Sequence, residues 1–189
     1  MKRIYTKTGD KGQTALINGE RLAKDSLVFT VLGTLDEFNA SLGLLVANWD
    51  EALLGKISEN NLKELVKQKT FLLDLQRQLF KLGAEIAKSP KVIFPNEFLN
   101  EMEKNIDNLQ NKLGKDFWSN FVLPGGSQLA AQTDLSRTIC RRLERKLVAL
   151  DGERDLRDIL VKFINRTSDY LYILRSFINF QLEIKEIPV

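Results

Sequence analysis

Residues 25–49 read DSLVFTVLGTLDEFNASLGLLVANW, and the spacing of the apolar side chains in this stretch decides the fold. These side chains recur every three or four positions, which is the period of an amphipathic helix and not of a strand. The short polar residues Asp25 and Ser26 stand just before them and are typical of a helix N-terminus. We therefore predict a helix from about Asp25 to Trp49 with one buried stripe, formed by Val28, Val31, Leu32, Leu35, Phe38, Leu42, Leu45 and Trp49.

The same period returns four more times along the chain, which predicts an all-α protein. We expect these further helices to run from Ser58 to Ser89, Asn96 to Gly114, Ser127 to Gly152 and Arg154 to Ile184. The four prolines fall between or after these segments, where they do not interrupt a helix. Long helices with short connections indicate a five-helix up-and-down bundle over residues 25–189. An irregular polar arm over residues 1–24 precedes it in the same single domain.

Length and composition fit one domain with one core, because 43% of the 189 residues are apolar and 28% are charged. A net charge of +3 is too small to indicate nucleic acid binding. The single cysteine, Cys140, excludes a disulfide within the chain and fits a reducing compartment, so we expect a cytoplasmic protein. The sequence shows no membrane-spanning run and no apolar leader. Because it has no histidine, any proton or metal chemistry must use carboxylates, lysine, tyrosine or the substrate.

The arm contains the polar stretch TKTGDKGQT at residues 6–14. Glycines let backbone N–H groups approach an anion, lysines neutralise its charge, and Asp10 could help to hold Mg²⁺ on a polyphosphate. The spacing is not that of a Walker A loop. A loose polar terminus is the alternative interpretation, and the stretch alone does not decide between them.

The helix expected over residues 127–152 has a strongly basic face. Arg137, Arg141, Glu144 and Arg145 cluster on it, and Arg142 lies nearer its edge. The opposite face is apolar and is formed by Leu135, Ile139, Leu143, Leu147 and Leu150. The basic face is either a solvated surface with Glu–Arg pairs or a phosphate site, since guanidinium groups bind phosphate in bidentate fashion.

Three other positions carry polar or exposed groups that need an explanation. Asn165, on a polar stripe of the last helix with Asp169, either faces solvent or bonds to phosphate or a nucleoside. Asp36 and Asn39 flank the apolar stripe of the first helix, so we expect Asp36 to be half-buried and to need a cationic partner. Phe121 precedes a Pro-Gly-Gly turn, where it either closes the core or contacts a ligand.

Six motifs, taken together and in this order, resemble those of the PduO-type ATP:cob(I)alamin adenosyltransferases. They are TKTGDKG at 6–12, GERLAK at 19–24, GTLDEFN at 33–39, FVLPGG at 121–126, RTICRRLER at 137–145 and FINRTSDYL at 163–171. The resemblance spans nearly the whole chain. It implies a ferritin-like five-helix bundle that assembles as a homotrimer with active sites between subunits.

The resemblance also implies a reaction, in which the 5′-deoxyadenosyl group of ATP passes to the cobalt of a reduced corrinoid and triphosphate leaves. Cobalt(I) is itself the nucleophile, so the protein would do little acid or base chemistry, which suits a chain without histidine. Its tasks would be to position C5′, to stabilise the leaving triphosphate and to make Co(II) reducible. ATP, Mg²⁺ and cobalamin are thus the expected ligands, and a flavin-type reductase is a candidate electron donor.

Site residues follow from the same resemblance. The ATP site would be lined by Thr6, Lys7, Thr8, Gly9, Asp10, Gly12, Lys24, Arg137, Arg141, Glu144 and Asn165. Mg²⁺ would be carried mainly by the phosphates, with no certain protein ligand. The corrinoid site would contain Phe121, Asp36 and Asn39, with Phe121 on the lower axial side of cobalt, where it favours a four-coordinate Co(II) that accepts an electron more readily. The catalytic residues would be Arg137, Asp36 and Phe121, with Arg137 paired to Asp36 across the subunit interface.

The chain departs from the family pattern at three points. Asp134 stands where a histidine is sometimes found, and Thr167 where a leucine is usual. The sequence stops at Val189, whereas many relatives continue with a tail that folds over the corrinoid. We therefore expect weaker closure over the corrinoid.

Two other functions compete with the enzyme. One is a non-catalytic helical module whose arginine face binds nucleic acid or an acidic partner. The lack of any aromatic residue between Ser127 and Leu150 counts against it, because single-stranded nucleic acid is usually bound by stacking. The other is a trimer that binds ATP or corrinoid only as a sensor.

Overall fold

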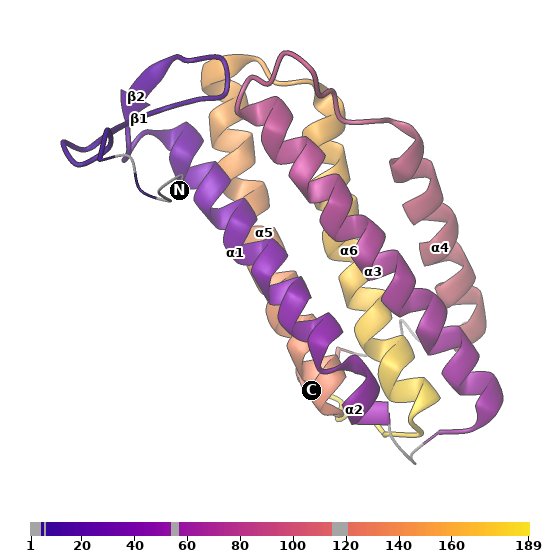
Figure 1. The fold of residues 1–189 in the computed structure, drawn as a ribbon. Coiled ribbons are helices and arrows are strands. Elements are labelled where there is room, and N and C mark those ends of the chain that lie inside the picture. Colours follow the sequence, from indigo (N-terminus) through magenta and orange to yellow (C-terminus); the bar gives the residue numbers. More distant parts are fainter. Residues whose placement is uncertain (1–4, 6, 54–56, 115–120) are drawn as a thin grey trace.

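The structure is a computed structural model that describes residues 5, 7–53, 57–114 and 121–189. The described residues form a two-stranded hairpin followed by six helices (Figure 1). These elements are β1 Gln13–Ala15, β2 Arg21–Ala23, α1 Leu27–Ala47, α2 Trp49–Leu53, α3 Glu59–Ile86, α4 Glu97–Leu113, α5 Gln128–Arg154 and α6 Asp158–Gln181.

The long helices α1, α3, α4, α5 and α6 run alternately up and down, which confirms the predicted bundle (Figure 1). Helix α6 packs mainly against α5 and α4, while α1 packs against α5 and α3. The first predicted helix ends at Ala47, two residues before the predicted Trp49, and the short helix α2 begins at Trp49 and runs beyond the predicted boundary. The helix is interrupted at Asn48. Trp49, the next residue, is still fully buried, so the predicted apolar stripe continues past the interruption.

Helix α6 is buried on nearly all sides because other helices surround it. Its polar residues must therefore find partners inside the protein. Thr167, which departs from the sequence pattern noted above, donates its hydroxyl to the Phe163 carbonyl at 2.7 Å. A short polar side chain is tolerated at this buried position because its own helix satisfies it.

Some helix boundaries differ from the sequence prediction. Helix α5 does not end at Gly152 but at Arg154, where Asp155 takes a left-handed conformation with φ 49°. The Leu156 N–H then donates to the Asp151 carboxylate at 2.8 Å, which stabilises the turn without a glycine. Helix α6 accordingly begins at Asp158, later than the predicted Arg154, and ends at Gln181, earlier than Ile184.

The arm is attached to the bundle at its hairpin. Strands β1 and β2 pair antiparallel, with Thr14 opposite Leu22. Leu16 is buried, and the Ile17 N–H donates to the Ala87 carbonyl at 3.0 Å. Glu20 pairs with Lys88 at 2.7 Å, and this hydrogen bond lowers the pKa of the Glu20 carboxyl. From Gln13 onward, the arm therefore has regular structure and is attached to the bundle, and the alternative of a loose terminus does not hold for this part. None of the helices described is long and apolar enough to cross a membrane.

Candidate active site

The loop before β1 is shaped by backbone contacts and by one arginine. The Gly12 N–H donates to the Gly9 carbonyl at 3.2 Å, and Gly12 takes a φ of 77° that favours glycine. Arg21 donates to the Thr8 carbonyl at 3.2 Å. Lys24 lies against this loop, since a β-carbon on Gly9 would be 3.2 Å from the Lys24 ammonium nitrogen. Glycine at position 9 thus makes room for a cation beside the loop.

Most of the predicted ATP-binding residues of the arm lie in this loop, and Lys24 lies against it. Lys7, Thr8, Asp10, Gly12 and Lys24 are exposed, and Gly9 is half-buried. Thr6 lies outside the described residues. Figure 1 shows the loop projecting away from the bundle, beside the start of α1.

The basic face of α5 is as the sequence predicts, with one exception. Asn165 on α6 donates to Glu144 on α5 at 2.8 Å, so two predicted ATP residues from different helices meet. Arg141 and Arg145 are exposed and form no ion pair with any described residue. The exception is Leu135, which was expected in the core but is exposed. Arg142, at the edge of this face, does pair with Glu37, so an arginine–glutamate pair accounts for part of the face but not for Arg141 and Arg145.

The Arg137 side chain is largely shielded from solvent, with 22% of it exposed. Its Nε donates to Asp134 Oδ1 at 2.8 Å, one helical turn earlier on α5. Asp134 is itself buried, with 6% of its side chain exposed. The remaining guanidinium N–H groups of Arg137 are oriented by this contact and can serve an anion.

The prediction that Asp36 is half-buried is wrong for the single chain that the structure contains. Asp36 is exposed and has no ion pair among the described residues, because α1 turns Leu35 and Phe38 inward instead. It lines a mainly apolar cavity of about 280 Å³ between α1 and α3, together with Asn39 and Phe80. Asn39 is buried, and its Oδ1 has no hydrogen-bond partner among the described residues.

Phe121 does not close the core, because 84% of it is exposed. Its loop is held by residues near the C-terminus, where the Val189 N–H donates to the Phe121 carbonyl at 2.9 Å. The Leu123 N–H donates to the Ile187 carbonyl at 2.8 Å, and Val122 and Pro188 form an antiparallel bridge. Of the two sequence interpretations, ligand contact is the one compatible with this position.

The profile of the cobalamin adenosyltransferase family matches residues 4–178. The chain belongs to this family. It is 34% identical to a cobalamin adenosyltransferase of Cupriavidus metallidurans, over 95% of this chain and 89% of the relative. It is 33% identical to a corrinoid adenosyltransferase of Bacillus subtilis, over 94% of this chain and 86% of the relative.

Solved structures of the same family have the same fold. A variant of a PduO-type ATP:corrinoid adenosyltransferase from Lactobacillus reuteri, complexed with cobalamin and ATP, superposes with a TM-score of 0.86. The two sequences are 28% identical, and the match covers 99% of each chain. A second variant of that protein, complexed with ATP, superposes with a TM-score of 0.82 at 29% identity, over 98% of this chain and 99% of the other.

In this family member, one chain does not bring all the predicted site residues together. Arg141 and Arg154 are separated by about 20 Å of helix α5, at 1.5 Å per residue. The hairpin is tied to Arg154 through Glu20 at 3.5 Å, so the arm lies at one end of α5 while Arg137 and Arg141 lie further along. The Phe121 loop precedes the opposite end of α5.

Sequence reasoning missed two functional-site candidates in this family member, Arg175 and Glu186. Only 2% of the Arg175 side chain is exposed, yet it carries a charge within the bundle. Its Nη1 donates to Glu186 Oε1 at 3.0 Å, and its Nε lies 3.5 Å from Asp134 Oδ2. The signal available in the sequence was the position of Arg175 between Leu174 and Phe177, two apolar residues of the last predicted helix.

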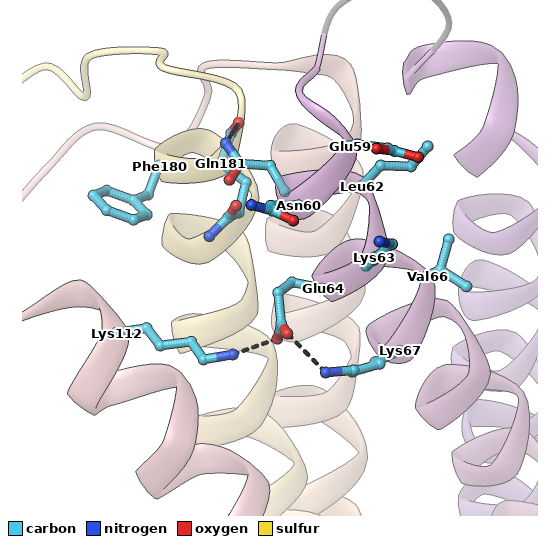
Figure 2. Close-up of a pocket in the computed structure, with 11 residues that line it drawn as sticks. Glu59, Asn60, Leu62, Lys63, Glu64, Val66, Lys67, Lys112, Phe180 and Gln181 are labelled. Atoms are coloured by element: carbon cyan, nitrogen blue, oxygen red, sulfur yellow. Dashed lines mark hydrogen bonds and ion pairs between the residues drawn. The ribbon is translucent and has the colours of Figure 1, made fainter.

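A large cavity among the described residues lies away from all these side chains. It has a volume of about 810 Å³ and opens beside the start of α3 and the end of α6 (Figure 2). There Glu64 pairs with Lys67 at 2.7 Å and also with Lys112, and these hydrogen bonds lower the pKa of the Glu64 carboxyl, with that of Lys112 contributing most. No predicted site residue lines this cavity, so size alone does not identify the active site.

Proposed function

We propose that this chain transfers the 5′-deoxyadenosyl group of ATP to the cobalt of reduced cob(I)alamin or a related corrinoid, giving adenosylcobalamin and triphosphate. One observation carries the proposal. Arg141 and Arg145 stand exposed without ion pairs among the described residues, on the face where Asn165 meets Glu144. Arginines that lack a protein counter-charge are suited to bind a polyanion.

The residues would act by binding and electrostatics. Arg137, Arg141 and the arm lysines Lys7 and Lys24 would neutralise the charge that develops on the leaving triphosphate. Glu144 and Asn165 would orient ATP so that its C5′ faces the cobalt. The cobalt supplies the attacking electron pair, so no protein base is required.

Mg²⁺ is part of the proposal and would travel with the phosphates. The residues fit such an ion, because Asp10 offers an exposed carboxylate beside Thr8 and Gly9, and Mg²⁺ prefers oxygen ligands. When bound, the ion would draw negative charge away from the bridging phosphate oxygens.

We also propose a homotrimer whose active sites lie between subunits. The arm loop projects away from the bundle (Figure 1), and the hairpin is tied to Arg154 at one end of α5 while Arg137 and Arg141 lie further along that helix. A neighbouring chain would complete the site. Leu44 on α1 and Leu135 and Val148 on α5 are exposed, as expected of an interface on these helices. Asp36, which has no ion pair among the described residues of its own chain, would then pair with Arg137 of the next subunit.

The corrinoid would lie against Phe121 of one subunit and the cavity beside Asp36 and Asn39 of another. Phe121 would occupy the lower axial side of the cobalt and favour four-coordinate Co(II). Electrons would come from a separate flavin-type reductase in the cytoplasm. The only cysteine of the sequence, Cys140, is buried, and burial raises the pKa of its thiol. It is therefore a poor source of the reactive thiolate and a poor electron donor.

A single assay tests the reaction against the two rival functions. The protein is mixed with MgATP and chemically reduced cobalamin, and the loss of the Co(I) absorption is followed. Rapid loss with release of triphosphate is expected. If the spectrum stays unchanged although ATP binds, the protein is a sensor. If neither ATP nor corrinoid binds, a non-catalytic module is the better description.

A further inference from the structure

We propose that the segment 185–189 is a positioning element that couples the Phe121 loop to Arg137, through the buried guanidinium of Arg175. This inference rests on the proposed function and adds residues that act through others, not on substrate directly. It has four steps, each based on a contact in the described part of the chain.

The first step is the pairing of this segment with the Phe121 loop. Two backbone hydrogen bonds join them, from Leu123 N–H to the Ile187 carbonyl and from Val189 N–H to the Phe121 carbonyl. The loop is exposed and contains the Pro-Gly-Gly turn. Where segment 185–189 lies therefore determines where the Phe121 ring is presented.

The second step is the anchoring of this segment by Glu186. Its carboxylate accepts from Arg175 at 3.0 Å, from Ser176 at 3.3 Å and from Asn179 at 3.1 Å. Only 20% of the Glu186 side chain is exposed. Asn179 also donates to the Gly125 carbonyl at 3.1 Å, so the same cluster holds the far end of the Phe121 loop.

The third step is the position of Arg175 between two carboxylates. Its Nη1 binds Glu186, while its Nε lies 3.5 Å from Asp134 Oδ2 without hydrogen-bond geometry. Asp134 uses its other oxygen, Oδ1, to accept from Arg137 at 2.8 Å. Two arginines thus compete for Asp134, and in this arrangement Arg137 has the better contact.

The fourth step follows from charge balance. Arg175 and Arg137 are matched by Glu186 and Asp134, so the cluster is neutral overall. If Glu186 loses its charge or its place, Asp134 is the one carboxylate that remains for the buried Arg175 among the described residues, and an uncompensated buried charge is costly. Asp134 is then drawn toward Arg175 and away from Arg137, which loses its orientation in the ATP site.

The competing explanation is that Glu186 only fastens the end of the chain. Such a role would change stability but not the properties of the two ligand sites. Glu186→Gln separates the two explanations, because it keeps the shape and most hydrogen-bonding atoms while removing the charge. Glu183→Gln is the matched control, since Glu183 is exposed and lies on the same stretch of chain.

The measurements are the melting temperature, MgATP affinity by calorimetry without corrinoid, KM and kcat, and the spectrum of four-coordinate Co(II) with ATP bound. For Glu186→Gln we expect MgATP affinity to fall about fivefold to tenfold, within the usual range of coupling between sites. We also expect a smaller fraction of four-coordinate Co(II), with Glu183→Gln unchanged in both. Asp134→Asn should reproduce the loss of ATP affinity, and the double variant should lose less than the sum of the two.

A Glu186→Gln variant that melts earlier but keeps the control's ATP affinity and Co(II) spectrum would overturn the proposal. If Glu186→Gln does not fold, Glu186→Asp takes its place, because the shorter side chain withdraws the carboxylate from Arg175. An ATP affinity equal to that of the control would then overturn the proposal equally. Failure of the proposed function looks different. The unchanged protein would then show no adenosyl transfer, while the calorimetric comparison would still report on the link from Glu186 to Arg137.

Discussion

The Asn165 amide on α6 donates to the Glu144 carboxylate on α5 at 2.8 Å. This contact fixes the direction of two side chains beside the exposed Arg141. The other side-chain amide hydrogen and the second carboxylate oxygen are left to face a ligand. A neutral donor and an acceptor side by side suit the polar groups of a nucleotide, next to arginines that suit its phosphates.

Removing this amide should weaken ATP binding. We expect Asn165→Ala to reduce MgATP affinity about tenfold, because Glu144 would then be unrestrained and its negative charge would lie near the phosphates. Calorimetric titration with MgATP measures the change. Lys162→Ala is the control, since Lys162 is an exposed residue of the same helix whose ion pair within the described part of the chain is with Asp158, at 3.5 Å. Equal affinities for the two variants would exclude Asn165 from the site.

Substitutions at Arg137 and Phe121 should impair different steps of the reaction. Arg137→Ala should strongly reduce both ATP binding and turnover, because it removes a phosphate-binding group and the proposed partner of Asp36. Phe121→Ala should leave ATP affinity unchanged and mainly impair reduction of Co(II), because its ring is exposed on a loop away from the arginine face. ATP calorimetry and the Co(II) spectrum of each variant distinguish these outcomes. Equal losses of ATP affinity would contradict the assigned roles.

The sequence predicted those parts of the molecule that depend on local periodicity. The helical period and a few motifs were sufficient for the bundle, the arginine face of α5 and the neighbourhood of Glu144 and Asn165. Asp36 was misjudged because its burial depends on which side of α1 faces α5 and α3, a choice that the flanking position left open. Gly152 was taken as the end of α5, whereas an Asp151 side-chain hydrogen bond ends the helix further on.

The cluster of Asp134, Arg175 and Glu186 could not be found by such reasoning. Its members come from α5, α6 and the residues after α6, and only the folded chain brings them together. Asp134 was visible in the sequence as a departure from the family pattern, but its partner was not. Ion pairs between distant segments leave no periodic signal, so a structure is needed to see them.

The ion pair between Glu85 and Arg157 predicts how stability responds to acid. Arg157 Nε donates to Glu85 Oε1 at 2.7 Å, and this bond lowers the pKa of the Glu85 carboxyl below its ordinary value of 4.5. The unfolded chain therefore binds the proton more readily, so the pair's contribution is present above pH 4.5 and is lost as the pH falls through the lower, folded-state pKa.

Glu85→Gln should consequently lower the melting temperature near neutral pH and flatten its decline in acid. The expected loss at neutral pH is about 1 kcal/mol, or roughly 2–4 °C for a domain of this size. Melting curves from pH 7 to pH 3 measure it. Asp158→Asn is the control, because Asp158 is exposed and should change neither the midpoint nor its pH dependence. A parallel decline for Glu85→Gln and the unchanged protein would contradict the linkage.

Gly126 stands at the junction of the Phe121 loop with α5, where both the backbone conformation and a close side-chain contact favour glycine. Its φ is 94°, and a β-carbon would lie 2.4 Å from the Asn179 amide, whose oxygen accepts from the Ser127 N–H at 2.9 Å. Gly126→Ala should therefore cost about 3 kcal/mol or more and displace the loop, with a lower melting temperature and less four-coordinate Co(II). Gly152→Ala is the matched control. Gly152 lies within α5 with nothing within 4 Å of an added β-carbon, so that change should stabilise the protein by about 1 kcal/mol. Thermal melting of both variants decides the matter, because a Gly126→Ala protein as stable as the Gly152→Ala protein would mean that this junction does not constrain the loop.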